Sequence, residues 1–189
     1  MIKILIYSIT LVFSFFLGSM ALSSPILDPI KQAAEQIKAG NINNAITILT
    51  LIAEKGDSIA DWALVRIYIF SSSRYNNTEK GIESLLRLSA RNNADSKEAL
   101  GDLYYYGRRV PQDYKKAAGW YADYVKYERD PDILTRYGLL LAMGKGVEKD
   151  ETAAFKLFRE AALKGYIPAI LLGRKVYQRL GPIERFFIE

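Results

Sequence analysis

The segments LGDLYYYGRRVPQD, residues 100–113, and YGLLLAMGKGVEKD, residues 137–150, repeat one pattern 37 residues apart. The positions that agree are two glycines, a valine and an aspartate: Gly101 and Gly138, Gly107 and Gly144, Val110 and Val147, Asp113 and Asp150. Gly173 follows Gly138 by 35 residues, and Tyr68 precedes Tyr104 by 36. A period of this length is typical of stacked helical hairpins, so we expect a repeat protein.

Apolar residues within each period have helical spacing. After the turn of the second copy they form two adjacent rows, Ala153, Leu157 and Ala161 beside Ala154, Phe158 and Ala162. Such a broad stripe predicts a helix, because a strand would alternate with a period of two. Asp113 and Asp150 stand where these helices begin, and a carboxylate there can cap free backbone amides. We therefore interpret both aspartates as structural.

The pattern predicts an all-α fold, a right-handed α-solenoid of stacked helical hairpins. The expected helices cover residues 28–39, 42–55, 58–70, 78–90, 96–106, 113–127, 132–143, 150–164 and 167–180. They make a repeat domain over residues 28–181, with its clearest copies at 96–130 and 132–166. Neighbouring hairpins complete each other's core. The apolar tail at 182–189 is expected to fold back as a cap on the stack, with a docking peptide as the alternative.

The first residues have the order of a secretion signal. A positive start precedes 14 apolar or small hydroxyl residues at 4–17, and small residues follow at Ser19 and Ala21. A membrane-spanning helix would need about 20 residues. We therefore expect a signal peptide at 1–21, cleaved after Ala21 or alternatively after Ser23, then a short linker at 22–27. The mature protein would be periplasmic or secreted, with no stable membrane anchor.

The composition excludes several kinds of chemistry. The 189 residues contain no cysteine and no histidine, which rules out disulfides, Cys/His zinc sites, thiol redox centres and His-based catalytic triads. Half of the residues are hydrophobic, enough to form a core. The net charge of +5 is spread along the chain and is too small to indicate a nucleic-acid partner.

The pattern over residues 99–121 resembles the Sel1-like repeat, a relative of the tetratricopeptide repeat, in its Leu-Gly pair, its Gly-to-Val turn, its Asp and its later Ala before an aromatic residue. Residues 137–165 are similar and closer to the family's form, whereas 58–95 are a degenerate copy with a polar loop at 71–77. Arg109 stands where Gly146 keeps the family's second turn glycine. If that position requires a positive φ, the side chain costs about 1 kcal/mol.

The resemblance implies a binding scaffold without chemistry of its own. Similar proteins commonly act as adaptors in the bacterial envelope, in signalling, secretion, polysaccharide export or toxin neutralisation. The densest acidic patch, Glu128, Asp130 and Asp132, lacks the spacing of a known metal loop, and we interpret it as a solvated turn with a helix cap. We therefore predict no catalytic residue, no cofactor and no metal site.

Tyrosines crowd into one repeat and suggest where a partner binds. The resemblance places Tyr104, Trp120 and Tyr121 in the core. The remaining aromatic residues and two arginines form the candidate partner-binding site: Tyr105, Tyr106, Arg108, Arg109, Tyr114, Tyr124 and Tyr127. Tyr and Arg supply many hot spots of protein interfaces.

We therefore predict a non-enzymatic protein–protein interaction scaffold of the bacterial envelope. Its groove would hold another envelope or secreted protein, in an adaptor, regulatory or toxin-neutralising immunity role. The alternative is a polysaccharide- or peptidoglycan-binding module that uses surface tyrosines. Nucleic acid is not an expected partner, because an exported chain rarely meets it.

Overall fold

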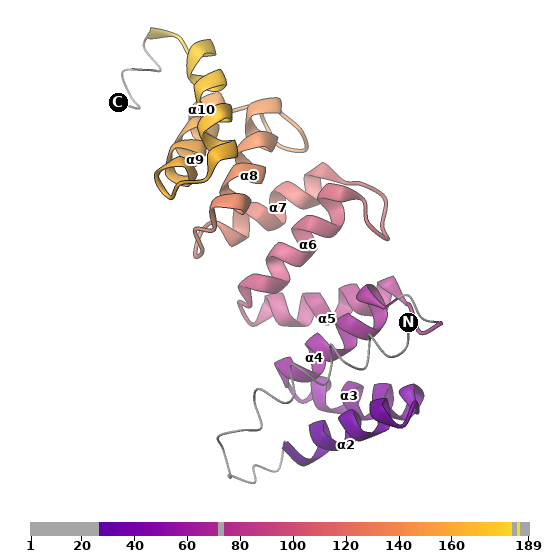
Figure 1. Cartoon of the computed structure of the whole chain (residues 1–189). Helices are drawn as coiled ribbons and strands as arrows, with labels where there is room; N and C mark the ends of the chain where they lie inside the picture. Colours follow the sequence, from indigo (N-terminus) through magenta and orange to yellow (C-terminus); the bar gives the residue numbers. More distant parts are fainter. Residues whose placement is uncertain (1–26, 72–73, 183–184, 186–189) are drawn as a thin grey trace. The chain divides into compact units, whose positions relative to one another are not determined.

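The computed structural model describes residues 27–71, 74–182 and 185, and the regular elements in this part of the chain are all helical (Figure 1). They are α2 (Leu27–Lys38), α3 (Ile42–Glu54), α4 (Ser58–Val65), the π-helical turn η1 (Arg66–Phe70), α5 (Thr78–Ala90), α6 (Ala94–Tyr106), α7 (Tyr114–Tyr124), α8 (Pro131–Met143), α9 (Glu151–Leu163) and α10 (Ile167–Arg179). The all-α prediction is confirmed, and apart from the helix expected over 58–70, whose last five residues are π-helical, the helix ends are shifted by at most three residues.

Three predictions fall wholly or largely outside the described residues. These are the signal peptide at 1–21, the linker at 22–27 apart from its last residue, and the capping tail at 182–189 apart from Pro182 and Arg185. They stay predictions. Among the helices that are described, none combines the length and the apolar character that crossing a membrane requires.

The chain divides into two compact units, one up to Leu88 (unit 1) and one from Ser89 (unit 2). In unit 1, α2 packs against α3, and α3 against α4. Together with the π-helical turn η1, these helices form one buried cluster: Ile30, Ala33, Leu49, Ile52, Ala53, Ala60, Leu64, Ile67 and Tyr68. The helices expected over 28–39 and 42–55 therefore pair as a hairpin, and this hairpin packs on the first helix of the degenerate copy at 58–95.

The helix expected over 58–70 changes type at its end. Residues Arg66–Phe70 form a π-helical turn rather than continuing α4. The wider turn places three successive side chains, Ile67, Tyr68 and Ile69, in the interior, each at most 6% exposed. Apolar spacing indicated a helix here but not this irregularity, because π-turns have no separate hydrophobic period.

Unit 2 contains the two clear repeats. Helices α6 and α7 form one hairpin and α8 and α9 the next, while α10 packs on α9 and α8. Because α7 also packs against α8, one core runs through successive hairpins. Its fully buried members include Tyr121, Ile133, Leu134, Leu140 and Phe158. Stacked hairpins are thus confirmed in this unit.

Close helix approach in each hairpin depends on a glycine facing an aromatic ring. A Cβ atom added at Gly101 would lie 2.4 Å from the Tyr121 ring, and one at Gly138 would lie 2.8 Å from the Phe158 ring. Real Cβ atoms do not approach neighbours so closely. The glycines and rings therefore repeat together as two halves of one packing unit.

Asp113 and Asp150 cap helices as expected, and Asp130 supplies the cap expected in the acidic patch. The Asp113 carboxylate accepts a hydrogen bond from the Lys116 amide at 3.0 Å, and Asp150 accepts one from Ala153 at 2.8 Å. Asp130 accepts bonds from the amides of Asp132 and Ile133 at the start of α8. These carboxylates stabilise helix starts in the way that the sequence indicated.

Candidate functional site

The seven predicted partner-binding residues all belong to unit 2, but their exposure differs. Tyr106 is 41% exposed, Tyr127 is 71% exposed, and Arg108 and Arg109 are exposed as well. These four are placed to meet a partner.

The other three tyrosines take part in packing. Tyr105 and Tyr114 are half-buried against the core of unit 2. Tyr124 is only 7% exposed, so its interpretation as a residue beyond the needs of the core is wrong. The reason is helical: Tyr124 follows the buried Tyr121 by three residues and lies on the same face of α7. Of the residues assigned to the core, Tyr121 is fully buried, whereas Tyr104 and Trp120 are half-buried.

Tyr105 links the surface rings to the core. Its ring meets Tyr106 edge-on at 4.9 Å between centroids and Tyr114 at 5.8 Å. On its inner side it lies 5.9 Å from the buried Tyr121 ring. Contacts of this kind are favourable beyond the area that they bury. The exposed Tyr106 ring is therefore held by contact with a ring that itself packs on the core.

Cations lie over the exposed rings of Tyr106 and Tyr127 and over the half-buried ring of Tyr114. The Arg108 guanidinium is 4.6 Å from the Tyr106 centroid, and the Lys145 ammonium is 4.9 Å from that of Tyr114. Lys97 lies 5.0 Å from the Tyr127 ring. Sequence reasoning missed Lys145, although the signal existed: it follows Arg108 by 37 residues, the period of the repeat.

The turn between α8 and α9 holds Lys145 in place. Gly146 has φ +70°, and a Cβ there would lie 2.2 Å from the Tyr114 carbonyl carbon, so this turn sits directly on the first residue of α7. Arg109 has φ +64° at the equivalent position. The second turn position is thus left-handed in both copies, as the resemblance suggested.

A polar network joins α6 to α8 beside these rings. The Tyr121 hydroxyl donates to Asp102 at 2.7 Å, and Arg136 bonds the same carboxylate at 2.5 Å. Arg136 also pairs with Asp132, which accepts a bond from the Tyr166 hydroxyl at 2.7 Å. Burial and the bond to Asp102 raise the pKa of Tyr121. Each of these polar groups has a hydrogen-bond or ion-pair partner in the network. We interpret the network as a structural link between successive repeats.

Glu98 lies close enough to this network to interact electrostatically with Asp102 and Arg136. Burial raises its pKa, and the neighbouring carboxylates of Asp102 and Asp130 raise it further, against the opposing effect of Arg136. Within the described ranges, however, no three acidic side chains come together in a way that could hold a metal ion. Asp130 caps α8 and Asp132 pairs with Arg136, in line with the interpretation of this patch as a turn and a cap.

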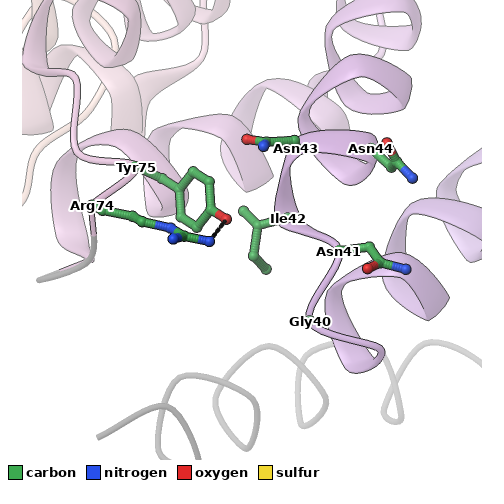
Figure 2. Close-up of a pocket in the computed structure, with 7 residues that line it drawn as sticks. All are labelled: Gly40, Asn41, Ile42, Asn43, Asn44, Arg74 and Tyr75. Atoms are coloured by element: carbon green, nitrogen blue, oxygen red, sulfur yellow. Dashed lines mark hydrogen bonds between the residues drawn. The ribbon is translucent and has the colours of Figure 1, made fainter.

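Unit 1 has a separate polar pocket, lined by the α2–α3 turn and by Arg74 and Tyr75: Gly40, Asn41, Ile42, Asn43, Asn44, Arg74 and Tyr75. Figure 2 shows Ile42 pointing toward Arg74 and Tyr75, whose side chains are joined by a 3.0 Å hydrogen bond. The lining residues include no carboxylate or other general base. None of the sequence-predicted site residues belongs to this pocket.

Comparison with known proteins identifies the repeats. The model of the Sel1 repeat family matches residues 94–122 and 132–166. Human protein sel-1 homolog 2 is 28% identical over 131 residues, which is 66% of this chain and 19% of the relative. This chain therefore spans about a fifth of that protein's length.

Solved structures agree on the fold. A Sel1 repeat protein from Oxalobacter formigenes matches with a TM-score of 0.60 at 22% identity, covering 82% of this chain and 62% of that one. A protective antigen of uropathogenic Escherichia coli matches with a TM-score of 0.57 at 23% identity, covering 75% and 30%. At this level of identity the likeness shows a shared fold alone.

Proposed function

We propose that this chain, whose residues 94–122 and 132–166 match the Sel1 repeat family, binds another protein through the exposed residues at the α6–α7 turn and at the end of α7. Sel1 repeat proteins are typically protein-interaction scaffolds and are generally non-catalytic. The residues placed to make contact are Tyr106, Arg108, Arg109 and Tyr127.

The exposed Tyr106 carries the proposal. It leaves 41% of its surface open although its neighbours Tyr105 and Tyr121 show that the same region can bury tyrosine. Its ring is fixed from beneath by Tyr105 and flanked by arginine, so little conformational entropy remains to be lost on binding. A rigid aromatic side chain beside arginine is the usual composition of an interface hot spot.

The cellular setting is part of the same proposal. The signal-like residues 1–21 would place the protein in the periplasm or outside the cell, where its partner would be an envelope or secreted protein. Adaptor, regulatory and toxin-neutralising roles all suit a scaffold of this kind. The identity of the partner would decide among them.

Protein is favoured over glycan by the cations on the rings. A sugar stacks on an open aromatic face, but Arg108 and Arg136 both lie over Tyr106, at 4.6 and 5.4 Å, and Lys97 lies over Tyr127. A glycan would have to displace these cations from the faces that they occupy. A polypeptide can instead use the ring edges and the outward-facing donors.

Site-specific photo-crosslinking in cells that naturally produce the protein tests the proposal. A benzophenone amino acid in place of Tyr106 should give a discrete light-dependent adduct with another protein. The matched control is the same substitution at Leu51, which is 57% exposed and belongs to unit 1. Equal adducts from both positions, or none from position 106, would contradict a specific interface there.

A further inference from the structure

We infer that the tyrosine–cation surface, defined as Tyr106, Arg108, Tyr114 and Lys145, recognises an acidic segment of the partner protein. The inference rests on the proposed function and adds the chemistry of the partner. It is carried by the charges of this surface and by the way that they are held.

The two cations keep their hydrogen-bonding capacity. Arg108 and Lys145 contact tyrosine faces at 4.6 and 4.9 Å, and no carboxylate of the described residues lies within ion-pair distance of either. A guanidinium or ammonium held over a ring face is attracted electrostatically, and its N–H groups remain able to donate hydrogen bonds. Both groups can therefore donate charge-assisted hydrogen bonds to carboxylates of a partner.

Most acids of the two turns are engaged elsewhere; Glu148, three residues after Lys145, is exposed and is not paired with it. Asp113 and Asp150 cap helices α7 and α9. Glu151 pairs with Lys149 and Arg179. Over residues 106–116 and 143–151, six Lys and Arg residues outnumber four Asp and Glu residues, and this charge balance favours an anionic partner over a basic one.

Arg136 differs from Arg108 because it is paired with carboxylates. It also approaches the Tyr106 ring, at 5.4 Å, but its guanidinium is bonded to Asp102 and Asp132. Burial alone would lower its pKa, and these two carboxylates outweigh that effect and raise it. Arg136 is a structural cation, whereas Arg108 is available for binding.

The spacing suits an extended peptide. Arg108, Tyr106, Tyr105, Tyr114 and Lys145 form one chain of contacts, with links of 4.6, 4.9, 5.8 and 4.9 Å. The two cations are thus at most about 20 Å apart, which about six extended residues can span. Two acidic side chains separated by a few residues would reach both.

The test is a binding titration with the full chain and three probes. The first is an octapeptide of alternating Glu and Gly, the second replaces each Glu by Gln, and the third is a four-unit galacturonate oligosaccharide, which carries the same four carboxylates on a glycan. The glutamate peptide should bind most tightly. The Arg108→Gln/Lys145→Gln double variant should weaken its binding tenfold or more, as expected for two charge-assisted bonds.

Matched variants distinguish a specific site from a general effect of the protein's positive charge on affinity. Lys116 lies 4.8 Å from the Tyr104 ring, and Tyr104 and Tyr106, two residues apart on α6, point to different sides of that helix. Lys116→Gln should therefore change the affinity less than twofold. Tyr106→Phe keeps the ring face and should retain binding, whereas Tyr106→Leu removes the face and should lose several-fold; circular dichroism verifies that each variant folds.

Three results would overturn the inference: no binding of the glutamate peptide, equal losses from Lys116→Gln and the double variant, or tighter binding of the galacturonate than of the peptide. The crosslinking result distinguishes the two proposals. If position 106 captures a protein in cells but the acidic peptide fails to bind, the scaffold function stands and the acidic partner does not. If the peptide binds but no adduct forms, the surface binds anions in solution, and both the protein interface and its acidic segment are contradicted.

Discussion

Arg109 occupies a backbone conformation that residues with a side chain rarely adopt. Its φ of +64° matches the +70° of Gly146 one repeat later. The turn therefore keeps its shape without its glycine, and Arg109 carries the strain.

Substitutions at these two positions should have opposite effects. Arg109→Gly should raise the free energy of unfolding by up to about 1 kcal/mol, because glycine accepts this φ. Gly146→Ala should lower it by more than that, because its Cβ would meet the Tyr114 backbone at 2.2 Å. Urea denaturation measures both. A less stable Arg109→Gly would mean that contacts of the arginine side chain outweigh the strain.

Glu98 should make stability depend on pH in an unusual direction for an acid. Burial and nearby carboxylates raise its pKa above the ordinary 4.5, so the folded state favours its protonated form. That contribution is complete below the unfolded pKa and is lost as pH rises through the folded pKa. Glu98→Gln should therefore raise the melting temperature at pH 7 and leave it nearly unchanged at pH 3. A lower melting temperature at pH 7 would show that the charged form is stabilised.

At the level of helices, the 37-residue register predicted the elements of unit 2 well. It located the caps Asp113 and Asp150 and the ring-facing glycines, because these depend on local spacing. Exposure was harder to predict: the helix expected over 113–127 ends at Tyr124, so Tyr124 lies on the buried face of α7 while Tyr127 lies beyond the helix and is exposed. The π-helical turn at Arg66–Phe70 and the Lys145–Tyr114 contact also depend on packing between segments.

Removing one hairpin should be costly. Deletion of residues 132–166 takes out α8 and α9, which supply Ile133, Leu140 and Phe158 to the core shared with α7 and α10. The apolar faces left behind would no longer match, and we expect the melting temperature to fall by roughly 10 °C or more. Thermal unfolding followed by circular dichroism gives the value. An unchanged melting temperature would mean that the repeats do not depend on their neighbours.

For the whole molecule, the first residues predict export from the cytoplasm. If residues 1–21 are a signal peptide, protein isolated from its natural host should begin at Leu22 or Ser24. N-terminal sequencing of the purified protein checks this, with a version lacking residues 2–17 as the unprocessed control. Retention of Met1 in the natural protein would contradict export by this route.

Unit 2 contains tyrosines that we propose to bind a partner and tyrosines that pack in its core. The most direct test measures partner affinity and melting temperature on the same two variants, using the protein captured at position 106. Tyr106→Ala should weaken binding by roughly 1–3 kcal/mol with little change in melting temperature. Tyr124→Ala should instead destabilise the fold by about 3–5 kcal/mol, because it empties a buried aromatic site. If Tyr106→Ala lowers the melting temperature and leaves partner affinity intact, the exposed ring is a packing residue and the proposed interface is wrong.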